Sequence, residues 1–435
     1  MSKMICDNLS VGNDGVLMFG GHSTVDLIKK YGSPMYAMDE ERIRKNMRIY
    51  VNSMKKYFGE DSMPLLASKA ASFKQIYRIA KEENMGTDVV SSGEIYTAKS
   101  AGFPMEKAYF HSNNKTNEDI LFAMENGVGY FVADNKEEID AIDETAKKMG
   151  ICQKVLLRLT PGIDPHTYEA VATGKVDSKF GSAIETGAAE EITVYTLKKE
   201  NIKLLGFHCH VGSQVFDSDV YLAAGYIMLG FIADMKKKYS FITKELNLGG
   251  GYGVRYTPND PIIDIEENIK LVALETKKIA KKLGIDYPSI RMEPGRSIVA
   301  DAGITLYTAG SVKIIPEYKN YVSVDGGMPD NPRFALYQSP YSVMVANKVN
   351  EPCDFECSVV GRCCESGDIL QENVKLPKSV TKGDIIAVLT TGAYNYSMAS
   401  NYNRIPRLPI VMVKNGEDYL AVRRESFEDL VRNDI

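Results

Sequence analysis

The sequence has no apolar run long enough to cross a membrane. Its longest near-continuous apolar stretch, Val220 to Ala233, is interrupted by Gly225 and Gly230 and stops at Asp234. Such a stretch is shorter than the roughly 20 residues that a membrane span needs. The sequence also opens without the basic and then apolar segments of a secretion signal. We therefore expect a buried helix at 220–233, in a protein of the cytoplasm.

The sequence also lacks a cysteine pattern typical of disulfide bonds or of metal binding. The cysteines are odd in number and unevenly spaced, which fits a reducing cytoplasm better than a disulfide framework. Those near the C-terminus lack paired CxxC spacing and have no histidine near them in sequence, so we expect no metal site. The seven are Cys6, Cys152, Cys209, Cys353, Cys357, Cys363 and Cys364.

A basic surface is also missing. The 52 lysine and arginine residues are outnumbered by 57 aspartate and glutamate residues, and the basic residues never cluster with aromatic ones. We therefore expect no nucleic-acid partner. Both charge signs are spread along the chain, as in folded globular proteins. The length of 435 residues exceeds one ordinary core and predicts two domains.

Eight short β-rich segments alternate with longer helical patterns. Amphipathic helices are expected at Phe73 to Asn84, Gly93 to Ala101 and Lys136 to Met149. This alternation is typical of a parallel sheet closed into a (β/α)8 barrel, and an open doubly wound sheet is the competing fold. The expected strands are Pro64 to Ser68, Gly86 to Val90, Ala108 to Ser112, Gly129 to Ala133, Val155 to Leu159, Leu205 to Val211, Glu245 to Leu248 and Ser289 to Met292.

Chemically distinctive residues follow the expected strands, and their positions favour the barrel. Active groups in barrels gather at the carboxyl ends of the strands, with phosphate usually bound after strands seven and eight. Glycine-bearing turns stand after those two strands here. The residues, in strand order, are Lys69, Asp88, His111, Arg158, then His210 and Ser213, then Gly249 to Gly251, and finally Glu293 to Arg296.

A smaller β-rich domain is expected beyond about Ala302, where strands follow one another without helices. We place the barrel domain at 36–302 and assign 1–35 and 303–435 to a β-sandwich or β-barrel-like domain. The segment before Met35 has little helical character and is expected to add a strand. The other strands are Tyr321 to Val324, Phe355 to Val360, Ile385 to Leu389, and a hairpin of Ile410 to Lys414 and Asp418 to Val422 around Asn415-Gly416.

Two glycine-bearing turns suit an anion. Gly249 to Gly251 let backbone amides approach an anion closely, although such a triplet alone is more often a flexible turn. In Glu293-Pro294-Gly295-Arg296, proline fixes a turn and Arg296 offers a planar fork for phosphate or carboxylate. A surface turn with an ion pair is the alternative for the second motif, and the neighbouring glycines argue against it.

His208-Cys209-His210 alternates along the sixth expected strand, so both imidazoles are expected on one face. A metal site is conceivable, but no third ligand with sensible spacing accompanies them. We favour an aromatic lid over a flat cofactor, and a satisfied core histidine stays open for either residue.

Lys69 ends an apolar strand, where a lysine is expected to be partly desolvated and its pKa lowered. An amine nucleophile requires such a lowered pKa. A solvated loop lysine is the alternative, and position alone favours that alternative.

Ordered motifs run along nearly the whole chain. They are Thr87 to Glu94, His111 to Lys115, Thr173-Gly174, Ser178 to Gly181, His208 to Gln214, Asn247 to Gly251, Glu293 to Arg296, Asp325 to Met328, Cys364 to Asp368, Gly392 to Tyr394 and Ser397 to Asn403. Together they resemble the diaminopimelate decarboxylases, within the pyridoxal-phosphate decarboxylases built on an alanine-racemase-like barrel. The resemblance implies decarboxylation of meso-diaminopimelate to L-lysine, the last step of lysine biosynthesis.

The resemblance also implies the cofactor and its contacts. Lys69 would hold pyridoxal 5'-phosphate as a Schiff base, and Asp88 would lie at the cofactor. Glu293 would face the pyridine nitrogen and keep it protonated, which makes the ring an electron sink when carbon dioxide departs. His210 would stack on the ring, and Arg158 would lie near its phenolic oxygen. The phosphate would be bound by Ser213, Gly250, Gly251, Gly295, Arg296 and Tyr394.

The substrate's far end must be bound to orient the bond that breaks. By the resemblance, Arg296, Arg333 and Tyr337 would bind the distal carboxylate. Glu365 would bind the distal ammonium group, and Tyr394 would also contact the substrate.

The resemblance further implies a homodimer with shared active sites. Cys364 and Glu365 would come from the partner subunit, with Cys364 a candidate proton donor after decarboxylation. Taken alone, adjacent cysteines such as Cys363 and Cys364 are usually packing residues in a reduced protein.

The sequence departs from the family pattern at two places. Residues 66–71 read Leu-Ala-Ser-Lys-Ala-Ala, where the family usually has Tyr-Ala before the lysine and Ala-Asn after it. Phe334 stands where proline is usual. Both distal-carboxylate candidates, Arg333 and Tyr337, are retained.

Two alternatives stay open. The substrate could be ornithine, arginine or a carboxylated polyamine such as carboxynorspermidine, although Arg333 would repel a purely cationic tail. A non-catalytic paralogue that binds a partner is the remote alternative. Retention of Lys69, Glu293 and Cys364 argues against it.

Overall fold

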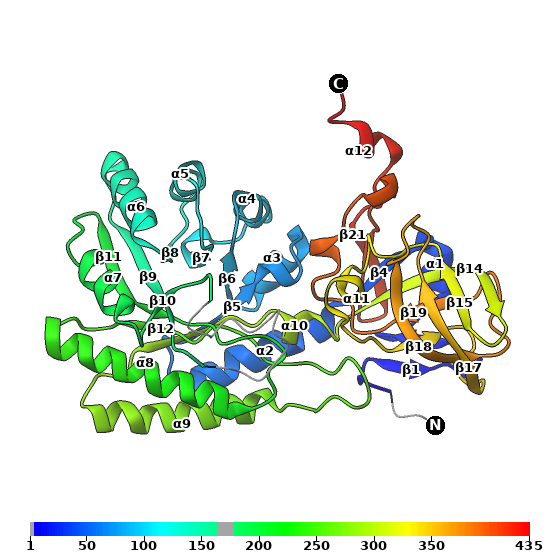
Figure 1. Cartoon of the computed structure of the whole chain (residues 1–435), viewed down its shortest axis with the longest axis horizontal. Helices are drawn as coiled ribbons and strands as arrows, with labels where there is room; N and C mark the ends of the chain where they lie inside the picture. Colours follow the sequence, from blue (N-terminus) through cyan, green and yellow to red (C-terminus); the bar gives the residue numbers. More distant parts are fainter. Residues whose placement is uncertain (1–3, 164–177) are drawn as a thin grey trace. The chain divides into compact units, whose positions relative to one another are not determined.

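The computed structural model describes residues 4–163 and 178–435, which form two compact units (Figure 1). One, the barrel unit, comprises Asn46–Gly253 and Ile262–Ser297. The other, the β unit, comprises Met1–Lys45, Val254–Pro261 and Ile298–Ile435. The sequence motif at 173–174 lies outside the described residues.

Eight parallel strands of the barrel unit pair in a closed ring. They are β5 (Met63–Ala67), β6 (Gly86–Val89), β7 (Ala108–Phe110), β8 (Tyr130–Ala133), β9 (Gln153–Thr160), β11 (Ile202–His208), β12 (Glu245–Asn247) and β13 (Ser289–Met292). Pairing of β13 with β5 closes the ring, and β10 (Ser182–Ala183) lies beside the end of β9. The expected (β/α)8 barrel is confirmed, and the open doubly wound sheet is excluded.

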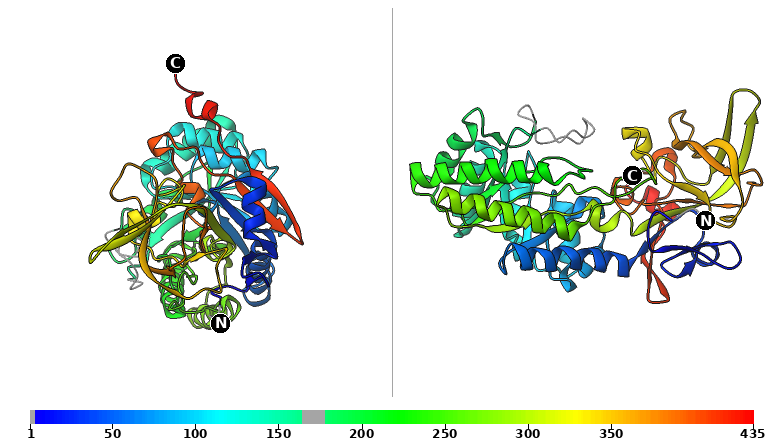
Figure 2. Two further views of the ribbon diagram at one scale, coloured as in Figure 1. Left: turned by 90° about the vertical axis from the view of Figure 1, so that its right-hand side faces the viewer. Right: turned by 90° about the horizontal axis from the view of Figure 1, so that it is seen from below.

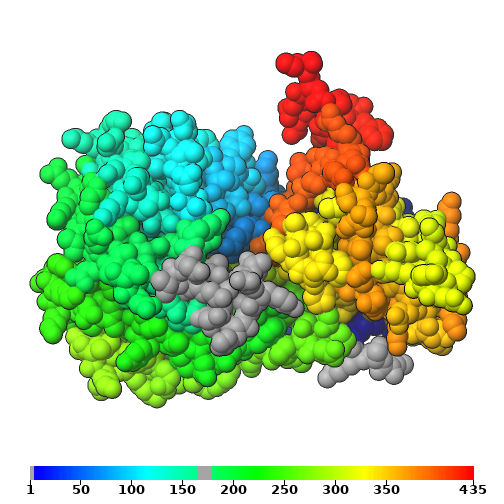
Figure 3. Space-filling model, viewed as in Figure 1, coloured from blue at the N-terminus to red at the C-terminus, as the bar shows by residue number. Residues whose placement is uncertain are grey.

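Helices alternate with these strands and carry clear local signals. In α6 (Lys136–Met149), Ile139 and Ile142 are buried at helical spacing, Asn135 caps the first turn, and Gly150 ends the helix in the left-handed conformation. Figure 3 shows this part of the chain in cyan at the surface of the barrel unit. The other helices are α2 (Glu40–Tyr57), α3 (Lys74–Glu82), α4 (Ser92–Ser100), α5 (Asn117–Glu125), α7 (Ala188–Thr196), α8 (Ser218–Tyr239), α9 (Ile265–Leu283) and α10 (Arg296–Val299).

The longest apolar stretch forms α8, which confirms the expected buried helix. Within the described part of the chain, α8 is the one helix long and apolar enough to cross a membrane. Nine of its residues are buried, and it packs against α9. A Cβ at Gly225 would lie 2.6 Å from the Thr276 methyl carbon, so glycine allows the two helices to approach closely. Packing between helices thus explains the apolar composition.

Nine strands of the β unit form one mixed sheet (Figure 2). They are β4 (Met35–Asp39), β14 (Gly303–Ile315), β15 (Lys319–Val324), β16 (Val343–Val345), β17 (Cys353–Val360), β18 (Ile369–Pro377), β19 (Ile385–Val388), β20 (Ile410–Lys414) and β21 (Glu417–Val422). Seven follow the order β18-β17-β15-β14-β4-β20-β21, and β19 pairs with β14 and β16. Asn415 and Gly416, with φ angles of 50° and 83°, form the expected hairpin turn. The β-rich second part of the fold is confirmed.

The N-terminal segment forms more structure than expected. Three short strands, β1 (Leu9–Val11), β2 (Leu17–Phe19) and β3 (His22–Ser23), make a sheet of their own. The expectation of little helical character was wrong, because α1 (Thr24–Tyr31) follows them. Leu27 of this short helix is buried in the apolar core of the β unit, so packing rather than intrinsic propensity stabilises it.

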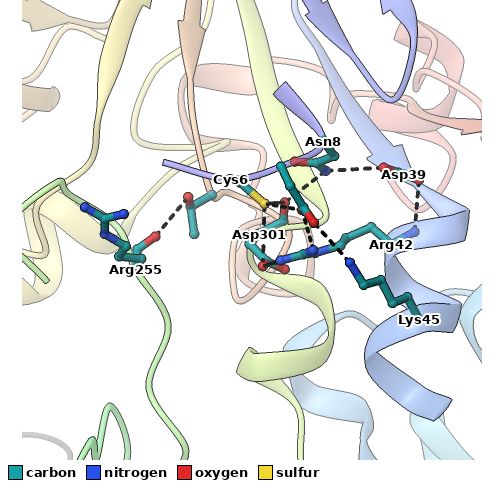
Figure 4. A network of polar contacts seen from close by, with 9 residues as sticks. Cys6, Asn8, Asp39, Arg42, Lys45, Arg255 and Asp301 are labelled. Atoms are coloured by element: carbon teal, nitrogen blue, oxygen red, sulfur yellow. Dashed lines mark hydrogen bonds and ion pairs between the residues drawn. The ribbon is translucent and has the colours of Figure 1, made fainter. Parts of the chain in front are cut away.

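Polar contacts tie the start of the chain to the rest of the β unit (Figure 4). The Asp301 carboxylate accepts hydrogen bonds from Arg42 Nη2 at 2.5 Å and Nε at 3.2 Å, and Arg42 also pairs with Asp7. Asn8 Nδ2 donates to the backbone oxygen of Asp301 at 3.2 Å. Burial and the Asp301 charge raise the pKa of Cys6 to about 12, so this thiol stays protonated. All seven cysteines are free.

Candidate active site

The carboxyl ends of β5 and β13 lie side by side at one rim of the barrel. The Ala67 amide at the end of β5 donates a 3.0 Å hydrogen bond to the Pro294 oxygen. A Cβ at Gly295 would lie 2.8 Å from the Ala67 side chain, so only glycine permits this approach. Lys69 lies in the single turn η1 (Ser68–Ala70) directly after β5. It is therefore placed beside the turn formed by residues 293–296.

The Lys69 side chain is exposed, which corrects the expectation that it would be partly desolvated. The strand before it is buried, and so are its neighbours Ser68 and Ala70 in the turn. Its charge still acts on the rim: burial and then Lys69 lower the pKa of His210 well below its usual range. Burial and the Glu293 charge hold the pKa of Asp88 well above its usual range, and Lys69 opposes that rise. An accessible amine thus stands among buried titratable groups.

Four buried polar residues meet inside the rim, and we name them the Glu293 cluster: His111, His208, Asn247 and Glu293. Asn247 Nδ2 donates a 2.7 Å hydrogen bond to Glu293 Oε1, and His111 Nε2 lies 2.7 Å from the same oxygen. His208 Nε2 lies 3.1 Å from Oε2. The two imidazole rings pack edge to face with their centroids 4.8 Å apart. Residues at or just after the ends of three strands, β7, β11 and β12, therefore surround the one carboxylate that follows β13.

The Glu293 carboxyl is held in its ionised form. Burial alone would raise its pKa, but His111 and His208 oppose this effect, and the pKa of Glu293 lies well below its usual range. Burial lowers the pKa of His111, and it lowers that of His208 to about 4 despite the Glu293 charge. Both imidazoles are therefore neutral near pH 7, where each can donate one N–H.

His210 and Arg158 are oriented by their own neighbours. β11 ends at His208, so His210 does not continue the expected alternation along the strand. The Gly250 amide donates a 3.3 Å hydrogen bond to His210 Nδ1, which leaves the ring proton on Nε2. Arg158, in β9, places its guanidinium 4.2 Å from the centroid of the Phe180 ring.

A set of anion-binding donors follows β11, β12 and β13. Arg296 donates to Ser213 Oγ from Nη2 at 2.9 Å and from Nε at 3.3 Å. Gly249 and Gly251 have φ angles of 70° and 122°, which other residues rarely adopt. A Cβ at Gly250 would lie 2.0 Å from a backbone oxygen of the next turn. Backbone amides, a hydroxyl and a guanidinium are donors that fit a phosphate group.

The β unit holds the candidates for a substrate's distal carboxylate. Arg333, the first residue of α11 (Arg333–Tyr337), is buried and donates hydrogen bonds to two tyrosine hydroxyls at 2.7 and 3.1 Å. Among the residues described, no carboxylate forms an ion pair with it. Tyr337 is 40% exposed. Tyr394, whose ring centroid lies 6.0 Å from the Arg333 guanidinium, has a φ of 63°, uncommon for a residue other than glycine.

The loop between β17 and β18 carries Cys364 and Glu365, and both are exposed. Buried Asp368 shapes this loop, because its carboxylate accepts the amides of Cys363 at 2.7 Å and Met328 at 2.6 Å. Burial and the Asp368 charge raise the pKa of Cys363 to about 12, so its thiol stays protonated. Cys363 is therefore a loop residue rather than a nucleophile.

No role could be assigned to His111 or Asn247 from the sequence, and three interpretations stayed open for His208. Each stands at or just after the carboxyl end of a barrel strand, namely β7, β12 and β11. That position is the signal that could have singled them out. These residues meet at Glu293 only because the barrel closes, so their proximity is not visible in the order of residues along the chain.

No third ligand with sensible spacing accompanies His208 and His210 in the sequence, but the structure brings two other candidate ligands to His208. The ligand atoms of His111, His208 and Glu293 lie within 4.8 Å of one another, a group that could hold a metal ion. Metal-bound histidines usually donate their second ring N–H to a partner, and His208 Nδ1 has none among the described residues. The arrangement therefore favours a hydrogen-bonded carboxylate over a metal centre.

Comparison with known proteins agrees with this chemistry. The family model described as pyridoxal-dependent decarboxylase, pyridoxal binding domain, matches residues 41–300. Fold and site thus define a barrel enzyme of the pyridoxal-phosphate-dependent decarboxylases, a class of carboxy-lyases. Its cofactor is pyridoxal 5'-phosphate.

Similarity to individual proteins identifies the family within this class of decarboxylases. The chain is 45% identical over 424 residues to diaminopimelate decarboxylase from Bacillus subtilis, covering 97% of this chain and 95% of that protein. A crystal structure of diaminopimelate decarboxylase from M. jannaschii in complex with L-lysine is 32% identical, with a TM-score of 0.90 over 99% of this chain and 98% of that one. The chain belongs to the diaminopimelate decarboxylase family. A lysine/ornithine decarboxylase from Vibrio vulnificus, at 21% identity and a TM-score of 0.77 over 94% of this chain and all of that one, shares the fold alone.

Proposed function

We propose that this protein decarboxylates meso-diaminopimelate to L-lysine, the last step of lysine biosynthesis. The observation that carries the proposal is the barrel rim, where exposed Lys69 stands beside the ionised Glu293 carboxylate and the anion-binding donors. These groups match the aldehyde, the pyridine nitrogen and the phosphate of pyridoxal 5'-phosphate. The complex of a relative with L-lysine supports the proposed product.

Each rim residue has a proposed task toward the cofactor. Lys69 would hold it covalently through Nζ, Glu293 would pair with its pyridine nitrogen, and His210 would cover one face of the ring. Arg158 would lie near the phenolic oxygen, with Asp88 beside the lysine. The bound cofactor supplies the electron sink that decarboxylation needs. The phosphate would be bound by Ser213, Gly250, Gly251, Gly295, Arg296 and Tyr394.

The β unit supports a substrate with a distal carboxylate. Arg333 is a buried cation whose described partners are hydroxyl groups, so it can take a bidentate carboxylate without breaking an ion pair. A purely cationic tail, as in ornithine, would be repelled. We assign the distal carboxylate to Arg296, Arg333 and Tyr337, and the distal ammonium group to Glu365, with Tyr394 also at the substrate.

We also propose a homodimer in which Cys364 and Glu365 complete the partner's active site. Both side chains are exposed on a loop that Asp368 holds in place, which supports such a role. Cys364 would return a proton to the substrate after carbon dioxide leaves. The free cysteines support a location in the cytoplasm.

The substrate is tested with a panel of amino acids supplied to the cofactor-loaded protein: meso-diaminopimelate, ornithine, arginine, lysine and carboxynorspermidine. We expect carbon dioxide release and L-lysine formation from diaminopimelate alone. Faster turnover of any other compound would overturn the proposed substrate, and no turnover at all would favour a non-catalytic paralogue.

The shared site is tested by mixing two variants, Lys69→Ala and Cys364→Ala. Each alone is expected to lack most activity. In a mixed dimer one site has both an intact lysine and an intact cysteine, so random exchange should restore about a quarter of the sites. Failure of the mixture to regain activity, with exchange of subunits verified, would contradict shared sites.

A further inference from the structure

We infer that His111, His208 and Asn247 are positioning residues that hold Glu293 as a fixed, ionised carboxylate, and so set how tightly the protein binds the pyridine nitrogen of its cofactor. The inference rests on the proposed role of Glu293. It assigns a function to three buried residues that the cofactor and substrate contacts do not use.

The contacts in the Glu293 cluster leave room for one more donor. An ionised carboxylate has about four lone-pair directions. Oε1 has two nitrogens at 2.7 Å, from Asn247 and His111, whereas Oε2 has His208 Nε2 at 3.1 Å. These contacts leave one direction on Oε2. A protonated pyridine nitrogen is a donor of the right charge for it.

Burial makes the supporting contacts necessary. Glu293 is 8% exposed, His208 1% and Asn247 fully buried. A carboxylate transferred to such surroundings without donors would take up a proton, because burial raises its pKa. A protonated carboxyl group could no longer pair with a protonated pyridine. The two groups hydrogen-bonded to the carboxylate, Asn247 Nδ2 and His208 Nε2, therefore protect the charge on which the pairing depends.

The supporting residues are held by the barrel itself. His208 lies opposite Asn247 in the pairing of β11 with β12. The Asn247 side chain also accepts the Gly249 amide through Oδ1 at 2.9 Å, so it connects the carboxylate to the glycine turn. A site built on paired strands is held more accurately than one built on loops.

The test compares two ligands in the cofactor-free protein: pyridoxal 5'-phosphate and its carbocyclic analogue, in which CH replaces the pyridine nitrogen. The ratio of the two affinities measures the contribution of the pyridine nitrogen, because both ligands carry the same phosphate and aldehyde. A hydrogen bond to a charged group predicts a ratio of about 10 to 100 in the wild-type protein. Binding is followed by absorption, without any turnover.

We expect Glu293→Gln to bring the ratio close to one. His208→Leu and Asn247→Leu should each lower it at least severalfold, and His208→Gln, which keeps an N–H donor, should recover part of the loss. Ser213→Ala is the matched control, because it weakens both ligands equally and leaves the ratio unchanged. Thermal unfolding of each cofactor-free variant identifies any that fail to fold, and Asn247→Ser then replaces a misfolded Asn247→Leu.

The outcomes separate this inference from the proposed function. No cofactor binding by wild-type protein would contradict the proposed function itself. If the wild type binds the cofactor normally, but the affinity ratio stays at the wild-type value in folded His208→Leu and Asn247→Leu, the inference is overturned and the proposed function is not. If the cofactor-free wild type binds Zn²⁺ tightly and His208→Leu does not, these residues form a metal site, and the inference is overturned.

Discussion

The Arg333 guanidinium donates a 2.7 Å hydrogen bond to the Tyr341 hydroxyl, and this bond holds a buried cation in place without neutralising it. Neutral hydroxyl partners leave the charge available to a ligand, whereas a carboxylate partner would compete with it.

Replacing Arg333 tests this availability. Arg333→Ala should raise the KM for diaminopimelate by about 10- to 100-fold, because a charge-assisted contact is lost. Cofactor affinity should change little. Tyr341→Phe is the matched control, since it removes one hydrogen bond but keeps the cation, and its KM should rise less. Steady-state kinetics give both values, and an unchanged KM for Arg333→Ala would remove the case for a distal carboxylate.

Lys69 is predicted to be the residue that gives the loaded protein its colour. The purified protein should be yellow, with an absorption band that is missing in Lys69→Ala. The side chain is exposed, so the free energy of unfolding of the cofactor-free variant should stay within about 0.5 kcal/mol of wild type. Lys74→Ala, at an exposed position in the first turn of α3, should keep the band. A yellow Lys69→Ala protein would identify a different amine.

Asp330 should make the stability of the β unit depend on pH. Burial raises the pKa of this carboxyl from its usual 3.8 to about 7, although the Gly327 amide donates to it. Because the folded-state pKa is the higher one, the stabilising contribution is complete below about pH 4 and is lost as the pH rises through 7. Relative to Asp330→Asn, wild type should lose about 2 to 3 kcal/mol between pH 5 and pH 8.

Denaturant unfolding at the two pH values measures this difference. Tyr36→Phe is the control, because it removes a hydrogen bond to the backbone oxygen of Asp330 and leaves the carboxyl group in place. It should weaken the fold equally at both pH values. A wild-type protein whose stability follows Asp330→Asn across this range would refute the prediction.

A buried ion pair inside the barrel is expected to contribute only to the free energy of unfolding. Arg291 Nη2 lies 2.9 Å from Glu245 Oε2, and Tyr109 donates to Glu245 Oε1 at 2.7 Å. Arg291→Met should lower the free energy of unfolding by about 3 to 5 kcal/mol, because it leaves a buried carboxylate without its cation. The double variant with Glu245→Leu should lose less than the single one. Equal losses would show that packing, not charge, explains the effect.

Much of the fold could be predicted because its signals are local. Ile139 and Ile142 repeat at helical spacing within α6, and Asn415-Gly416 specifies a tight turn wherever the hairpin lies. The helix α1 was missed because Leu27 stabilises it through a core assembled from distant strands. The exposure of Lys69 was missed for a related reason, since an apolar strand says little about the surroundings of the residue after it.

By itself, the sequence determined the alternation of strands and helices, and it placed the amine of Lys69 and the carboxyl of Glu293 after their strands. Only the tertiary structure decided that His111, His208 and Asn247 surround that carboxyl. Residues so far apart in the chain meet because pairing of β13 with β5 closes the sheet into a ring. Closure brings all the strand ends to one rim, and strand register then decides which side chains face inward.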